Sequence, residues 1–257
     1  MGGPVSRRSV LRGAAWLGMT GSLDAAQPER APSGAPPPRK LRVVVAGGHP
    51  GDPEYGCGGT ILRYTDLGHD VALLYLNKGD WGFLEDPGSA PRVDRMAEAQ
   101  RACDILKARP LYASQLNGKA VVDRAHADEF RRILEAERPD VLITQWPLDG
   151  HADHRAVFAL VYEAWLRTGK KAALYFYEVS NGEDTLMFAP THYVDITATE
   201  QRKRAACYAH ASQTPDGYYG LQSRVTAFRG LESGHKHAEA YIRHVQSPGD
   251  LLPAGLP

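Results

Sequence analysis

The chain has 257 residues, of which 43% are hydrophobic and 23% are charged, and its 30 basic and 30 acidic side chains cancel. This composition excludes a disordered protein and allows one core-bearing domain of roughly 200 residues. The balanced charge, without a basic block, argues against nucleic acid or an anionic membrane as the partner. Three cysteines exclude a disulfide scaffold, and no apolar run approaches the roughly 18 residues of a transmembrane span.

The N-terminal segment is predicted to direct export. Residues 1–26 place paired arginines, Arg7 and Arg8, before a short apolar stretch, which is the pattern of a twin-arginine signal peptide. Residues 27–40 contain five prolines and are predicted to form an extended linker, which leaves 41–257 as the folded domain. We therefore expect an exported bacterial protein, periplasmic or extracellular. A basic tail without a targeting role is the alternative, and whether the signal is cleaved stays open.

The rest of the sequence alternates apolar strands with helical segments. Continuous β-branched runs indicate strands that are buried on both faces, and helices between them indicate right-handed crossovers. Thr197 and Glu200 have the spacing of a capping box at the start of a helix. The pattern predicts an α/β fold with a layered, mainly parallel sheet. The expected strands are 41–46, 70–76, 141–146, 173–179 and 192–196, and the expected helices are 58–67, 93–107, 128–137, 153–166 and 197–210.

Two clusters of histidine and carboxylate residues follow strands of this predicted sheet. His49 and Asp52 lie in a Gly/Pro loop after the first strand, and His151 and His154 follow the strand that ends near Trp146. Ligands of open α/β sheets bind where the strands end, and two imidazoles with one carboxylate form a catalytic type of zinc site. Each motif alone is more often a turn or a helix cap, and it is the presence of both that favours a metal site. A non-haem iron site uses similar ligands but usually a jelly-roll pattern, which this sequence lacks.

The motifs resemble those of a known enzyme family. The segments GGHPGDPEYGCGGTILRY, RMAEAQRACDIL, TQWPLDGHADHRAV and HAEAYIRH, in this order between about residues 41 and 253, resemble the LmbE-like, or PIG-L, family of zinc-dependent de-N-acetylases. The resemblance implies a Rossmann-like three-layer sandwich and one Zn²⁺ per chain, or another divalent metal in its place. It also implies an N-acetylated amino sugar or glycoconjugate as the small-molecule substrate. A homo-oligomer is an open alternative to a monomer.

The resemblance also implies roles for individual residues. His49, Asp52 and His154 correspond to the metal ligands of the family. His151 corresponds to the histidine that stabilises the oxyanion or protonates the departing amine, and Asp153 to the aspartate that holds this histidine. These five residues are the expected catalytic centre.

Further residues are expected on the substrate side of the pocket. Arg95 and Glu98 match the R-x-x-E helix of the family, whose arginine is associated with the substrate, although a simple ion pair along the helix is the alternative. Trp81 and Phe83 are candidates for stacking on a sugar ring, or equally for local packing.

One position departs from the family pattern. The aspartate that serves as general base in the family corresponds here to Gly51, which has no side chain. Asp149 is our first candidate for a replacement base and Glu54 the second. The alternatives are a catalytically impaired, metal-dependent glycan-binding relative, motivated by Gly51, and a zinc hydrolase of a non-sugar amide or ester.

Overall fold

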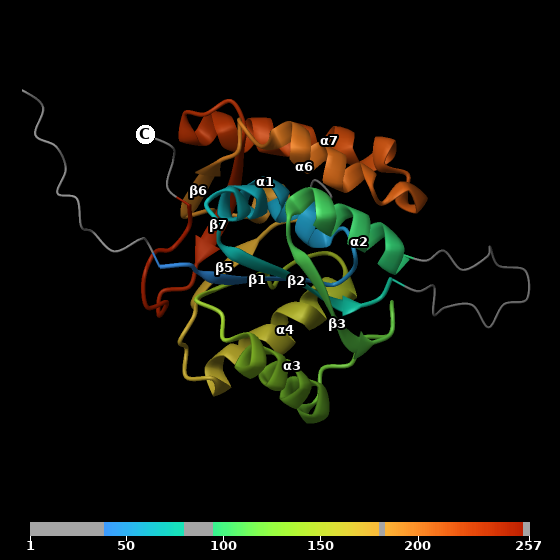
Figure 1. The fold of residues 1–257 in the computed structure, drawn as a ribbon, viewed down its shortest axis with the longest axis vertical. Coiled ribbons are helices and arrows are strands. Elements are labelled where there is room, and N and C mark those ends of the chain that lie inside the picture. The colour runs from blue at the N-terminus through green and yellow to red at the C-terminus, as the bar shows by residue number, and fades with distance from the viewer. Residues whose placement is uncertain (1–38, 80–94, 180–182, 254–257) are drawn as a thin grey trace, which may run out of the picture. The chain divides into compact units, whose positions relative to one another are not determined.

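The computed structural model describes residues 39–79, 95–179 and 183–253, and these form one seven-stranded sheet with helices on both faces (Figure 1). The strand order is β3-β2-β1-β4-β5-β7-β6. The strands are β1 (Arg42–Gly47), β2 (Asp70–Asn77), β3 (Arg109–Gln115), β4 (Val141–Gln145), β5 (Ala173–Tyr177), β6 (His192–Asp195) and β7 (Ala238–Arg243). The helices are α1 (Asp52–Asp66), α2 (Arg95–Leu106), α3 (Arg124–Glu137), α4 (Ala152–Arg167), α5 (Glu183–Met187), α6 (Glu200–Tyr208) and α7 (Pro215–Ser233).

The sheet is mainly parallel, as the sequence predicts. Strands β1 to β5 pair in parallel, whereas β7 runs antiparallel to both of its neighbours, β5 and β6. Helices α1, α2, α6 and α7 lie on one side of the sheet, and α3 and α4 lie on the other (Figure 1). The predicted three-layer α/β sandwich is confirmed.

Each face of the sheet has its own hydrophobic core. Along β1, Val43 and Val45 pack into the core beneath α1, α2 and α6, while Val44 and Ala46 pack into the core above α3 and α4. Burial on both faces explains why these strands consist of unbroken apolar runs. The close fit extends to α1, where a Cβ atom on Gly56 would lie 2.2 Å from the ring of Tyr177.

Several elements differ from the sequence prediction. Strands β3 and β7 and helices α5 and α7 were not expected. Pro110 suggested only the end of a helix, but it lies in β3, an edge strand, where a missing N–H is tolerated. Helix α7 begins at Pro215 and contains several glycines, so its intrinsic helix propensity is low and packing must stabilise it.

The start of α6 also differs from the prediction. The helix begins at Glu200, and its N-cap residue is Thr199, whose side chain makes no capping hydrogen bond. The prediction of a capping box at Thr197 is therefore wrong. The Thr199 hydroxyl instead donates to the carbonyl of Gly59 in α1, which ties the two helices together.

The predicted signal peptide 1–26 lies outside the described residues, as does nearly all of the linker 27–40, and both stay predictions. Within the described part of the chain, no helix is long and apolar enough to cross a membrane.

A buried ion pair joins α6, β7 and α1. The Lys203 ammonium lies 2.6 Å from Oε1 of Glu239, and both side chains are fully buried. The two Glu239 oxygens also accept the backbone N–H groups of Gly59 and Thr60 in α1 and the hydroxyl of Tyr241. A buried charge that loses its partner costs far more than an exposed one, so this pair is a sensitive point of the fold.

Replacement of Lys203 by methionine should lower the free energy of unfolding by about 3–5 kcal/mol, because Glu239 would stay buried without a counter-charge. The adjacent Arg202 forms an exposed pair with Asp66, so Arg202→Ala should cost less than about 1 kcal/mol. Urea denaturation of the three proteins measures both effects. Equal losses for the two variants would contradict the assigned role of Lys203.

Candidate metal centre and active site

The two histidine loops emerge side by side from the sheet. Strands β1 and β4 are parallel neighbours, with Val43 paired to Val141 and Ala46 to Thr144. The chain continues from β1 to β2 on one side, whereas β4 lies on the other side, so the strand order reverses between β1 and β4. In open α/β sheets this switch point, at the carboxyl ends of the strands, is where ligands bind. The topology thus explains why two distant motifs form one site.

Asp52 lies between two histidines, one from each loop. Its Oδ2 atom is 3.2 Å from Nδ1 of His49 and 3.0 Å from Nε2 of His154. Ligands about 2.0–2.1 Å from a zinc ion in a tetrahedral site lie roughly 3.3 Å from each other. The separation of Asp52 from each of the two histidines is therefore that of two ligands on one ion.

A buried carboxylate contacts the outer nitrogen of each of these histidines. Nε2 of His49 is 3.0 Å from Oδ2 of Asp153, and Nδ1 of His154 is 2.9 Å from Oδ2 of Asp149. Metal-binding histidines characteristically donate their second N–H group to a carboxylate, which fixes the ring and its tautomer. The chemistry of the donor set and its supporting carboxylates thus fits a divalent metal such as zinc.

The role expected for Asp153 differs in the structure. Its carboxylate does not contact the ring of His151. Instead, Oδ2 contacts His49 and accepts the backbone N–H of Gly118 at 2.7 Å and the amide of Asn77 at 3.3 Å. The carboxylate of Asp153 therefore positions His49 and not His151.

His151 is positioned by the helix that it caps. It is the N-cap residue of α4, and its Nδ1 atom accepts the backbone N–H of Asp153 at 3.2 Å. Its ring centroid lies 4.9 Å from that of His49 and 4.7 Å from that of His154. The three histidines can bring one nitrogen each within 4.8 Å of the others, so they form an alternative set of metal ligands.

The charges of the site are strongly coupled. Burial lowers the pKa of His154, but the carboxylates of Asp52 and Asp149 outweigh it and raise the pKa to about 10. Burial also lowers the pKa of His49, but Asp52 and Asp153 outweigh it and raise the pKa above its usual value. Burial raises the pKa of Asp52, but the two histidines hold it well below its usual value. These ion pairs indicate that positive charge is favourable between the three side chains, as metal binding requires.

The pKa of His151 shifts in the opposite direction. Partial burial, followed by the nearby His154 and His49, lowers its pKa. Because its Nδ1 atom accepts a backbone hydrogen bond, the neutral ring carries its proton on Nε2. His151 is thus a neutral donor next to a positively charged cluster.

Asp149 does not have a free oxygen for the role of base. Oδ2 contacts Nδ1 of His154, and Oδ1 accepts the backbone N–H of His151 at 2.7 Å. It therefore lies behind the His154 ring, on the side opposite Asp52. Its observed contacts fit a residue that orients both histidines of the second motif.

Glu54 is also fully engaged, and it is buried below the loop. Its Oε1 atom accepts the hydroxyl of Tyr75 at 2.7 Å and contacts Nε2 of His210 at 2.9 Å. Its Oε2 atom accepts the backbone N–H of Gly51 at 3.1 Å. Glu54 thus supports the loop from within the first turn of α1 and does not face the metal ligands.

Gly51 has a backbone conformation that favours glycine. It is the N-cap residue of α1, with φ of 114° and ψ of −38°. A Cβ atom built there would lie 3.8 Å from Cδ2 of His210 and 3.9 Å from Cδ2 of Tyr55, which is ordinary contact. Space is therefore available for a side chain, and the cost of one is backbone strain.

Two cavities flank Asp52 and share part of their walls. One has a volume of about 210 Å³ and the other of about 380 Å³. Asp52, Arg95, Gln213 and Tyr218 line both cavities. The candidate metal ligands therefore lie at the junction of two recesses. A substrate whose reactive bond lies at this junction would place one part in each recess.

Arg95 lines both cavities, and its expected role beside the substrate stays a prediction. It is buried, and it donates to the carbonyl of Pro50 at 2.5 Å. Among the described residues its Nε atom has no hydrogen-bond partner, and both Glu98 oxygens are bonded to Ser212, through its backbone N–H and its hydroxyl, and not to Arg95. Trp81 and Phe83, the stacking candidates, lie outside the described residues.

Two polar residues that were not expected from the sequence, Gln145 and Asn77, also support the site. Gln145 accepts the backbone N–H of Gly48 at 2.8 Å and approaches Oδ2 of Asp52 at 3.4 Å. Asn77 contacts Asp153. Each is the last residue of a buried strand. This position could have indicated a role at the site, because a buried polar side chain needs a hydrogen-bond partner.

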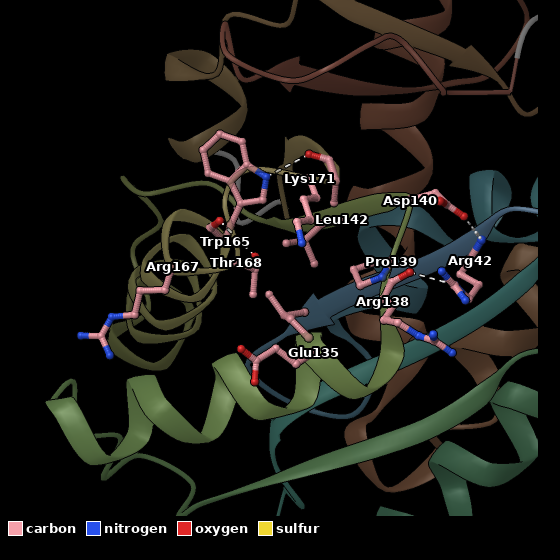
Figure 2. A pocket seen from close by; sticks show the side chains of 12 residues that line it. Arg42, Glu135, Arg138, Pro139, Asp140, Leu142, Trp165, Arg167, Thr168 and Lys171 are labelled. Atoms are coloured by element: carbon pink, nitrogen blue, oxygen red, sulfur yellow. Dashed lines mark hydrogen bonds between the residues drawn. The ribbon is translucent and has the colours of Figure 1, made fainter.

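A further cavity lies at the amino ends of β1, β4 and β5, opposite the histidine loops (Figure 2). Its volume is about 540 Å³, and it contains none of the residues expected at the active site. Arg42 donates to the carbonyl of Arg138, and the indole of Trp165 donates to the carbonyl of Ala172 (Figure 2). Size alone therefore does not identify the functional site in this fold.

Replacement of Asp153 by asparagine should weaken zinc binding about 10- to 100-fold, because His49 would lose its supporting carboxylate. His154→Ala should abolish binding of one zinc per chain, since it removes a ligand. The exposed Asp128, which pairs with Arg167, provides the control Asp128→Asn. Competition with a chelator measures the affinities, and unchanged zinc affinity in Asp153→Asn would contradict the assigned support.

Known proteins share sequence similarity with the part of the chain that contains this site. Residues 43–165 match the PIG-L family, described as GlcNAc-PI de-N-acetylase. The chain is 29% identical over 229 residues to diacetylchitobiose deacetylase of Thermococcus kodakarensis, which covers 82% of this chain and 85% of that protein.

Solved structures share the fold. The conserved protein TT1542 of Thermus thermophilus superposes with a TM-score of 0.68 at 27% identity, covering 83% of this chain and 98% of that one. N,N′-diacetylchitobiose deacetylase of Pyrococcus horikoshii superposes with a TM-score of 0.67 at 22% identity, covering 80% and 86%. The histidine motifs of both loops lie inside the matched region, so residues 43–165 are similar to the PIG-L, or LmbE-like, family of de-N-acetylases.

Proposed function

We propose that the protein is a zinc-dependent hydrolase that removes an N-acyl group, such as acetyl, from an amino-sugar substrate. The observation that carries the proposal is the contact of Asp52 with His49 and His154, each backed by its own buried carboxylate. The relatives named as diacetylchitobiose deacetylases support an N-acylated sugar as the substrate class.

Three residues hold the metal in this proposal, namely His49, Asp52 and His154. When bound, a zinc ion polarises an amide carbonyl and lowers the pKa of water towards about 7. Asp149 and Asp153 keep the two imidazoles oriented for that ion. Another divalent metal with the same ligand preference is the alternative.

His151 is the proton donor of the proposed reaction. Its neutral ring presents Nε2–H towards the larger cavity, which it lines. From there it would donate a hydrogen bond to the developing oxyanion. Once it has taken up on Nδ1 the proton that the attacking water releases, it would pass its Nε2 proton to the departing amine and return to the neutral ring. Arg95 lies in the same cavity and contributes positive charge beside the substrate.

The missing base at Gly51 sets the expected rate. General base catalysis contributes about 10²–10⁴-fold, whereas enzymes accelerate reactions by about 10⁶–10¹⁷-fold in all. Asp149 and Glu54 are engaged elsewhere, so the loss of the usual aspartate slows turnover without abolishing it. Gly51 also motivates the second candidate function, a metal-dependent glycan-binding protein that releases no acid. A zinc hydrolase of a non-sugar amide is the third.

The N-terminal sequence supports export of this enzyme. Arg7 and Arg8 before an apolar stretch fit a twin-arginine signal, and we therefore place the substrate outside the cytoplasm, in the periplasm or beyond the cell.

The zinc-loaded protein should release acid from N-acylated glucosamines, and His151→Ala should lower kcat by at least 10²-fold while zinc stays bound at one per chain. His154→Ala should lose zinc and activity together. Release of acetate and longer acids, quantified by chromatography, and metal content measure these effects. Sugar binding without acid release from any substrate would favour the glycan-binding alternative.

Replacement of Gly51 by aspartate should raise turnover of an N-acetyl substrate by about tenfold or more, because it restores a carboxylate beside the metal ligands. The same change should lower the free energy of unfolding by about 1–3 kcal/mol because of the positive φ. Gly51→Asn is the matched control, with the same strain and no base. Equal turnover in the two variants would show that the missing base does not limit the rate.

A further inference from the structure

We propose that the smaller cavity beside Gly51 is a pocket for an acyl chain, so that the substrate is an amine acylated with a chain longer than acetyl. This inference rests on the proposed function and specifies its substrate class. Four features of the molecule support it: the lining of the cavity, its position relative to His151, the missing side chain at position 51, and its volume.

The lining of the smaller cavity is mainly apolar. The metal ligands Asp52 and His154 form one end. Away from them, Pro50, Tyr55, Val179 and Tyr218 supply most of the apolar wall, and Arg95, His210 and Gln213 also line the cavity. Apolar walls next to a reactive centre favour a hydrocarbon group and not a sugar hydroxyl, which would lose its hydrogen bonds to water there.

The position of His151 distinguishes the two cavities. An amide at the metal has an acyl carbon on one side and a nitrogen on the other. His151, which protonates the departing nitrogen, lines only the larger cavity, together with Asn117 and Gly118. The amine half of the substrate therefore lies in that cavity, which has polar groups for a sugar. The acyl half is left to the smaller cavity.

Gly51 keeps the smaller cavity open. A Cβ atom at this position would point towards the rings of His210 and Tyr55, and both rings line the cavity. Any side chain at position 51 would extend into this space, including the aspartate that the family resemblance places there. Compared with an aspartate at this position, Gly51 thus lacks a catalytic base and leaves the cavity larger.

The volume suits a chain of several carbons. The cavity measures about 210 Å³. An apolar cavity of roughly 150 Å³ accommodates benzene, which has six carbons. A chain of about four to six carbons is therefore a good fit, whereas the methyl group of an acetyl would leave most of the space unused.

Product-like carboxylates test the pocket without any need for turnover. Acetate, butanoate and hexanoate are titrated into the zinc-loaded protein by calorimetry. The affinity should rise by up to about fourfold per added methylene, because each buried methylene contributes about 0.8 kcal/mol. Val179→Phe should remove this dependence by filling the cavity and should leave acetate binding unchanged. The control Val245→Phe changes an exposed residue and should retain the dependence.

Turnover is then compared for N-acetyl-, N-butanoyl- and N-hexanoyl-glucosamine. We expect kcat/KM to be more than tenfold higher for butanoyl than for acetyl, and this ratio should fall to about one or below in Val179→Phe. Binding that is independent of chain length, or a preference for the acetyl substrate that Val179→Phe does not alter, would overturn the pocket. Chain-dependent binding with no hydrolysis of any substrate would instead refute the proposed reaction and retain the pocket.

Discussion

Two hydrogen bonds from buried carboxylates to the outer nitrogens of His49 and His154 define the chemistry of this protein. Asp153 and Asp149 lie behind the two imidazoles and direct their inner nitrogens towards one oxygen of Asp52. Both carboxylates are buried, where an unpaired charge would be costly, so each needs its histidine as much as the histidine needs it. The remaining contacts of the site follow from this arrangement.

The sheet makes the arrangement stable. The reversal of strand order between β1 and β4 brings the two loops together, and polar residues at the ends of the strands complete the network. Gln145 joins the Gly48 backbone to Asp52, and Asn77 joins β2 to Asp153. On the far side of α1, Glu239 holds the backbone of the same helix through Gly59 and Thr60. The helix that presents Asp52 is thus held both at its first residue and near its middle.

The sequence predicted what depends on periodicity and on local motifs. The apolar strands, the α/β layering and the two histidine loops were all evident, because buried strands and the Gly/Pro loop have local signatures. Partners across the fold were not evident. Asp153 is only two residues from His151 in sequence, yet its carboxylate turns to His49, more than one hundred positions away, because β1 and β4 are neighbours. Likewise, α7 has a weak helical pattern, and packing decides its structure.

The substitution at position 51 links catalysis to specificity. A side chain there would start beside the rings of His210 and Tyr55, which line the smaller cavity, so a carboxylate at this position would also narrow that cavity. An enzyme with this backbone can have a carboxylate at that place or an open acyl pocket, but not both. If binding of a longer chain contributes about 0.8 kcal/mol per methylene, four methylenes contribute about 3 kcal/mol, which is comparable to the loss of a base. Only the part of this energy that is gained in the transition state increases kcat, so the glycine favours capture of a particular substrate over maximal turnover.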